Sequence, residues 1–160
     1  MGKKTGPNPT DRGKSGTKRS LLVDAAGIPL SVFAEGANVH DMCLVGANLL
    51  ELDDLWVKRP SPRRQRQGMC LDKGYDYPII RQLVRAYGFT PHIRSRGEEQ
   101  SALKRRRGYR PRRWVVERTH SWYNRNRGLL IRWCKKEANF VAQLHLATAL
   151  LVGGQIGLFG

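Results

Sequence analysis

Residues 20–33, SLLVDAAGIPLSVF, decide the fold of this chain. Two short runs of mainly apolar residues, 20–24 and 28–33, flank the small residues Ala25, Ala26 and Gly27. Branched and aromatic side chains favour strands, and a glycine between two strands permits the backbone of a tight turn. We therefore predict a β-hairpin at this point of the chain.

Downstream of the hairpin, apolar residues alternate between helical spacing and short continuous runs. The resulting order of elements is strand, strand, helix, strand, helix, strand, helix, helix. It predicts an α/β fold in which a hairpin is followed by alternating helices and strands and then by two C-terminal helices. The predicted strands after the hairpin span 68–72 and 89–93, and the predicted helices span 40–56, 76–87, a segment beginning at Pro111, and 138–152.

The flanks of this pattern have a different composition. Residues 1–17 are rich in Gly, Pro and Lys and have no hydrophobic period, so we predict a basic, flexible loop. Residues 18–153 are then one domain, and 154–160 are a tail.

Charge is the strongest compositional feature. The chain has 29 Lys and Arg against 13 Asp and Glu, a formal net charge of +16, which favours a polyanionic partner, nucleic acid before an acidic membrane. Its three cysteines and four histidines are scattered, without the spacing of a zinc site or a disulfide framework. No apolar run approaches the roughly 20 residues that span a bilayer. We expect a cytoplasmic protein with no membrane partner.

One acid stands out in the basic segment 104–136, which contains thirteen Lys or Arg and a single carboxylate, Glu117. One interpretation is a surface ion pair with Arg113, one helical turn earlier, worth about 0.2–0.5 kcal/mol. The other is a metal ligand beside nucleic-acid phosphates, which would explain why no second acid lies in this segment.

Asp72 has two similar interpretations. It follows the apolar run 68–71, and ligands of open α/β sheets collect at the carboxyl ends of strands. Asp beside Lys73 and Gly74 is also ordinary turn chemistry. Asp72 and Glu117 together could hold Mg²⁺, which prefers carboxylate oxygens, although a third acid would be expected for a pair of ions.

The remaining cations fall mostly in segments without hydrophobic periodicity, where their number favours contact with phosphates. Trp114, Trp122, Tyr123 and Trp133 are interleaved with them, and either stack on bases or pack in the core. The expected nucleic-acid contacts are Arg63, Arg64, Arg66, Lys104, Arg105, Arg106, Arg107, Arg112, Arg118, Arg125 and Arg127.

Five motifs follow one another in a familiar order. They are GPNPTDRGK (6–14), LLVD with GIP (21–24 and 27–29), GANVHD (36–41), LDKGYD (71–76) and RWVVER (113–118). Together they resemble the DDE transposases of bacterial insertion sequences, and LHLA (144–147) resembles the last helix of that family. The resemblance covers nearly the whole chain.

The resemblance implies a ribonuclease-H-like domain that cuts and joins DNA with a divalent metal, Mg²⁺ or Mn²⁺. Asp72 and Glu117 match two of the family's three catalytic acids, and Arg113 matches its basic residue one turn before the Glu. Asn124 departs from the pattern, because the family has Lys or Arg about seven residues after the Glu.

A second departure concerns completeness. In the family, the first catalytic Asp and the central first strand lie upstream of the GPNP motif, so we expect 18–153 to be a partial catalytic domain that is inactive alone. An upstream segment or a frameshift partner would supply both. The implied partners are double-stranded DNA at transposon ends and targets, and a second copy of the chain, with association to the nucleoid when bound.

Two other functions stay open at this point. A truncated, non-catalytic regulator or remnant of a transposase would bind DNA in a salt-dependent way without cutting it. A basic RNA-binding protein would fit the net charge, but gives no reason for Asp72 and Glu117.

Overall fold

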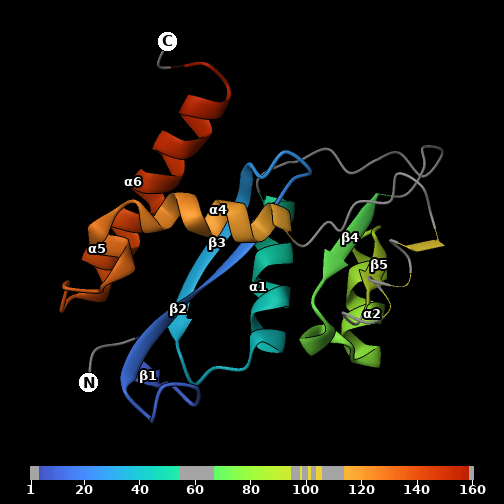
Figure 1. The fold of residues 1–160 in the computed structure, drawn as a ribbon, viewed down its shortest axis with the longest axis horizontal. Coiled ribbons are helices and arrows are strands. Elements are labelled where there is room, and N and C mark those ends of the chain that lie inside the picture. Colours follow the sequence, from blue (N-terminus) through green and yellow to red (C-terminus); the bar gives the residue numbers. More distant parts are fainter. Residues whose placement is uncertain are drawn as a thin grey trace.

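The computed structural model describes residues 4–54, 67–94, 98, 101, 104–105 and 114–158, arranged as helices around two small sheets (Figure 1). The elements are β1 (Gly6–Pro7), β2 (Ser15–Val23), β3 (Pro29–Gly36), α1 (Asp41–Asp54), β4 (Gly68–Leu71), the 3₁₀ helix η1 (Lys73–Tyr75), α2 (Pro78–Ala86), β5 (Thr90–Ile93), α4 (Trp114–Asn124), α5 (Arg127–Leu130) and α6 (Glu137–Gln155).

The predicted hairpin is confirmed. Strands β2 and β3 pair in antiparallel register, with Leu21 opposite Val32. Asp24 closes the turn, because its Oδ1 accepts from the backbone N–H of Ala26 at 2.9 Å and of Ile28 at 2.8 Å. Gly27 has φ +85°, a left-handed conformation that glycine adopts without steric cost.

The prediction of loop throughout 1–17 is wrong in the part that the structure describes. Gly6 and Pro7 pair with Gly16 and Ser15, so β1, β2 and β3 form a three-stranded antiparallel sheet. These residues show no alternation of apolar and polar side chains, because the pairing is made by backbone groups of small residues at the end of the sheet. The predicted tail also begins later than expected, since α6 continues to Gln155.

A second, parallel sheet consists of β4 and β5, connected by η1 and α2. This is the alternation of strand and helix expected from the sequence, so the α/β class is confirmed. Two C-terminal helices were expected, whereas three lie in the described residues after 113. The additional helix, α5, has four residues, too few to show a helical period.

Two apolar cores hold these elements. The first joins β3 to the C-terminal helices and contains Val32, Ala34, Tyr123, Leu129, Phe140, Leu144 and Ala147. The second joins α1, β4 and α2 and contains Val45, Leu49, Met69, Ile80 and Val84. Helix α1 contributes Val45 and Leu49 to the second core and also packs on both β2 and β3.

A buried amide fixes α1 against the hairpin. The Nδ2 of Asn48 donates to Ser20 Oγ at 2.8 Å, and its Oδ1 accepts from Ser31 Oγ at 2.8 Å. Because Asn48 and Ser31 are buried, these bonds satisfy polar groups that would otherwise be costly to desolvate. In the part of the chain that the structure describes, no helix is long and apolar enough to cross a membrane.

Candidate functional site

Asp72 lies directly after β4, at the carboxyl end of a strand that pairs in parallel with β5. Its backbone is extended, and its Oδ1 accepts from the backbone N–H of Lys73 at 2.6 Å, which caps η1. Its side chain is exposed. Both roles foreseen for Asp72 are therefore compatible: one oxygen starts a turn while the carboxylate stays at the end of the strand.

Asp76, four residues later, is a structural carboxylate. It accepts from Lys73 Nζ and from Arg81, whose Nε lies 2.7 Å from Oδ1. Hydrogen bonds from Lys73 and then from Arg81 lower the pKa of Asp76. Between Asp72 and Asp76, burial raises the pKa of Tyr75 to about 12, with smaller contributions from the charges of Asp41 and Asp72.

Glu117 lies in the first turn of α4 with its side chain exposed. Among the residues that the structure describes, no hydrogen bond or ion pair engages this carboxylate. Arg113, the partner in the surface-pair interpretation, lies outside the described residues. Val115, Thr119 and Tyr123 are buried and face the body of the protein, so Glu117 projects from the outer side of the helix.

Helix α4 is attached to the hairpin turn through Thr119 and Arg118. Thr119 is fully buried, and its Oγ1 lies 2.8 Å from the carbonyl oxygen of Gly27. The guanidinium of Arg118 lies between two indoles, 4.7 Å from the ring centroid of Trp114 and 4.9 Å from that of Trp122, and donates to the carbonyl of Ala26. The two indoles lie one helical turn on either side of Arg118 within α4, but no pattern within α4 signals the bonds to Ala26 and Gly27, which are 92 residues away.

A second cation reaches α4 from β2. Arg19 donates to Asn124 Oδ1 at 2.5 Å, and its guanidinium lies 5.8 Å from the centroid of the Tyr123 ring. Burial lowers the pKa of His120, and the charge of Arg19 lowers it further. Asn124, the position at which the resemblance led us to expect Lys or Arg, thus has a guanidinium beside it that comes from another element.

The expected phosphate contacts fall into three groups. Lys104, Arg105, Arg125 and Arg127 are exposed, whereas Arg118 is half-buried against the hairpin turn. The others lie outside the described residues: Arg63, Arg64, Arg66, Arg106, Arg107 and Arg112, with Arg113.

The donor set suits a hard cation in chemistry. Asp72 and Glu117 offer exposed carboxylate oxygens, the ligands that Mg²⁺ and Mn²⁺ prefer. In the described ranges, no group of three or more His, Cys, Asp or Glu is placed to hold a metal ion. Two carboxylates are fewer than the shell expected for a pair of ions.

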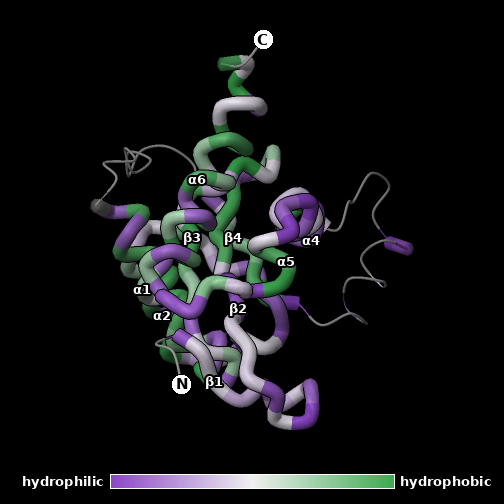
Figure 2. Tube along the Cα trace, turned by 90° about the vertical axis from the view of Figure 1, so that its left-hand side faces the viewer, coloured by the Kyte–Doolittle hydropathy of each residue, from purple (hydrophilic) through white to green (hydrophobic). Residues whose placement is uncertain are grey.

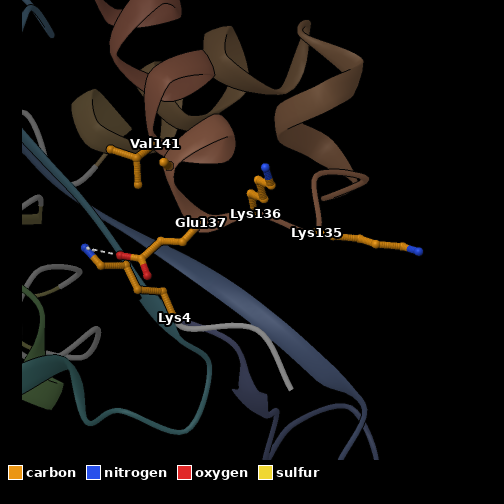
Figure 3. Close-up of a pocket in the computed structure, with 6 residues that line it drawn as sticks. Lys4, Lys135, Lys136, Glu137 and Val141 are labelled. Atoms are coloured by element: carbon orange, nitrogen blue, oxygen red, sulfur yellow. Dashed lines mark ion pairs between the residues drawn. The ribbon is translucent and has the colours of Figure 1, made fainter.

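A shallow hollow of about 540 Å³ lies at the start of α6 (Figure 3), and its lining contains none of the predicted site residues. It is lined by Lys4, Lys135, Lys136, Glu137, Ala138 and Val141. Lys4 Nζ pairs with Glu137 at 3.7 Å and with Glu35 at 3.6 Å, so this lysine is neutralised on two sides.

Comparison with known proteins places these features in context. A family model described as "Transposase DDE domain" matches residues 2–152. A protein of Burkholderia cepacia named "Putative transposase for insertion sequence element IS402" is 35% identical over 148 residues, which cover 92% of this chain and 68% of that protein. No solved structure is significantly similar to the chain.

Proposed function

The chain belongs to the DDE transposase family of insertion sequences, and from this premise we propose that it is the catalytic segment that cleaves and joins DNA strands with Mg²⁺ or Mn²⁺. Asp72 and Glu117 would hold the ion. When bound, it would activate the attacking oxygen and stabilise the leaving oxygen of a phosphodiester.

The observation that carries this proposal is the exposed carboxylate of Glu117, which has no partner among the residues that the structure describes. Several other described acids have cationic partners: Asp41 pairs with Lys18 at 2.6 Å, Glu137 pairs with Lys4, and Asp76 pairs with Lys73 and Arg81. In a chain with a net charge of +16, a carboxylate that has no described partner suits a ligand that is not part of the chain.

The chain's own residues would position Glu117 and the DNA. Thr119 and Arg118 fix α4 to the hairpin, which leaves Glu117 on the outer face. Arg113 would orient Glu117 or a phosphate, and the exposed cations Lys104, Arg105, Arg125 and Arg127 would bind DNA phosphates. Such binding would weaken steeply with salt, because each neutralised phosphate releases counterions.

We further propose that the domain is ribonuclease-H-like and takes its central strand, with the third acid, from an upstream segment or frameshift partner. Two strand edges support this idea. Within the described ranges, β2 pairs with β3 along 17–23 on one side, and β1 pairs with only Ser15 and Gly16 on the other. In the described residues, β4 pairs with β5 alone. One added strand between these edges would join the two sheets.

A strand-transfer assay tests the proposal. With the upstream segment and element-end DNA supplied, Asp72→Asn and Glu117→Gln should each lower the rate at least about 100-fold, because a metal contributes several kcal/mol to such reactions. Asp76→Asn is the matched control and should keep most of the activity. Full activity in both site variants would contradict the assignment.

The alternative function is a truncated, non-catalytic DNA-binding regulator or remnant. It is not favoured, because the family match over residues 2–152 includes both Asp72 and Glu117. That alternative requires the chain to bind DNA in a salt-dependent way. It also requires that no metal-dependent cleavage occurs, whether or not the upstream segment is added. The proposed enzyme would act in the bacterial cytoplasm, at the nucleoid when bound to DNA.

A further inference from the structure

The connector between α5 and α6, residues 131–136, presents apolar side chains to solvent. Trp133 is 76% exposed, more than any other large apolar side chain that the structure describes, and Leu130 and Ile131 are each 56% exposed. The other aromatic residues of this region have partners, since Trp114 and Trp122 stack on Arg118 and Tyr123 is buried. Trp133 is therefore the one whose exposure calls for an explanation.

The exposure of Trp133 is fixed by its neighbour Arg132. The Nε of Arg132 donates to the carbonyl of Cys134 at 3.2 Å, and its guanidinium lies 5.1 Å from the Phe140 ring centroid. Ile131 is extended, and side chains alternate in an extended chain, so an inward Arg132 directs Ile131 and Trp133 outward. Arg132 Nη1 lies within hydrogen-bonding distance of Lys4 O (3.0 Å), Thr5 Oγ1 (2.9 Å) and Thr17 Oγ1 (2.7 Å).

Cations lie before and after Trp133 in the sequence. Arg127, Lys135 and Lys136 are exposed in the described structure. The nearest acid in sequence, Glu137, is already paired with Lys4, and Figure 3 shows Lys135 extending away from that pair. An exposed aromatic ring in a segment with exposed cations and no free described acid nearby in sequence suits a ligand that has flat apolar faces and negative groups.

We propose that Leu130, Ile131 and Trp133, with Arg127, Lys135 and Lys136, form a connector surface that stacks Trp133 on an unpaired DNA base while the cations bind the flanking phosphates. The inference rests on the proposed function only in taking DNA as the partner. Aromatic platforms with basic neighbours bind single strands in this way, and each stacked base contributes about 1–3 kcal/mol. A rigid platform loses little entropy on binding.

The connector surface is separate from the proposed metal site. Asn124, the last residue of α4, is seven positions after Glu117, about 10 Å along the helix, and α5 follows before the connector. Figure 1 shows α5 and the connector at the far end of α4 from its first turn.

The test compares three DNA probes of equal length: a single strand, a duplex with one unpaired base, and a fully paired duplex. Trp133→Ala should weaken binding of the first two by about 5- to 100-fold and of the paired duplex by less than twofold, while Trp133→Phe keeps most of the affinity. Binding of the single strand weakens as salt rises, so the plot of log affinity against log salt has a negative slope. Lys135→Gln and Lys136→Gln should each make this slope shallower by about 0.7. Trp133→Ala should leave that slope unchanged.

Tyr77→Ala is the matched control, because Tyr77 is an aromatic residue 43% exposed beside α2, and it should change none of these affinities. Equal affinity of wild type and Trp133→Ala for the single strand would overturn the inference and leave the proposed function intact. Trp133-dependent binding to anionic vesicles without any effect on DNA would overturn it in favour of a membrane surface. Failure of the wild type to bind any DNA probe would overturn the proposed function as well.

Discussion

The buried hydroxyl of Thr119 lies 2.8 Å from the carbonyl oxygen of Gly27, a residue 92 positions earlier in the chain. This contact attaches α4 to the turn of the β2–β3 hairpin. At 100° per residue, Thr119 and Glu117 lie on nearly opposite sides of the helix. The hydrogen bond that fixes the inner face thereby determines the direction in which Glu117 points.

Removing the Thr119 hydroxyl should destabilise the protein. Thr119→Val keeps the shape of the side chain but leaves the Gly27 carbonyl without its partner, which costs about 1–3 kcal/mol of unfolding free energy. Thr119→Ser keeps the hydroxyl and should cost less. Urea unfolding measures both, and a Val variant more stable than the Ser variant would show that the hydrogen bond does not matter.

Gly27 should tolerate alanine less well than a glycine of similar backbone conformation. Gly27 and Gly13 both have positive φ, +85° and +72°. A Cβ at Gly27 would lie 2.8 Å from Arg118 Nη2, whereas one at Gly13 would meet nothing within 4 Å. Gly13→Ala should cost about 1–2 kcal/mol for its conformation alone. Gly27→Ala should cost more, because Arg118 is held between two indoles, and equal losses in urea unfolding would contradict the close approach.

Arg118 should act through the position of α4. Its guanidinium contacts Trp114, Trp122 and the Ala26 carbonyl. Arg118→Gln should therefore lower strand-transfer rate by roughly tenfold while the salt dependence of DNA binding stays unchanged. If Arg118 instead contacts a phosphate, as its charge first suggested, the slope of log affinity against log salt on duplex DNA would fall by about 0.9.

Stability should fall in mild acid because of His120. Burial and the nearby Arg19 hold the pKa of His120 below its ordinary 6.5, so the folded protein favours the neutral imidazole. The stability this contributes is present above pH 6.5 and is lost as pH falls, since the unfolded chain takes up the proton first. His120→Gln should flatten the dependence of unfolding free energy on pH, and the exposed His145→Gln should not. An unchanged acid loss in His120→Gln would contradict this origin.

Local patterns predicted the elements whose signals lie within a few residues. The hairpin around Gly27 and the strand ending before Asp72 are examples, because turn residues and apolar runs can be recognised from neighbouring residues in the sequence. β1 and α5 were not predicted, because strands of two residues and helices of four residues are too short to show a hydrophobic period.

The two acids of the candidate site were chosen from the sequence and remain a prediction, whereas the contacts that support them became visible only in the structure. Asp72 and Glu117 stood out through the motifs and the basic surroundings of Glu117. The attachment of α4 by Thr119 and the anchoring of the connector by Arg132 could not be foreseen, because each joins segments about 90 or more residues apart. Only the folded chain brings those groups together.

The most direct test of the central claim replaces Glu117 by cysteine and measures strand transfer in two metals. A thiolate is a poor ligand for Mg²⁺ and a better one for Mn²⁺, which tolerates softer donors. We predict that Glu117→Cys loses activity in Mg²⁺ and regains a substantial part of it in Mn²⁺, while Asp76→Cys responds alike in both. Equal activity of Glu117→Cys and wild type in Mg²⁺ would contradict a metal-binding Glu117.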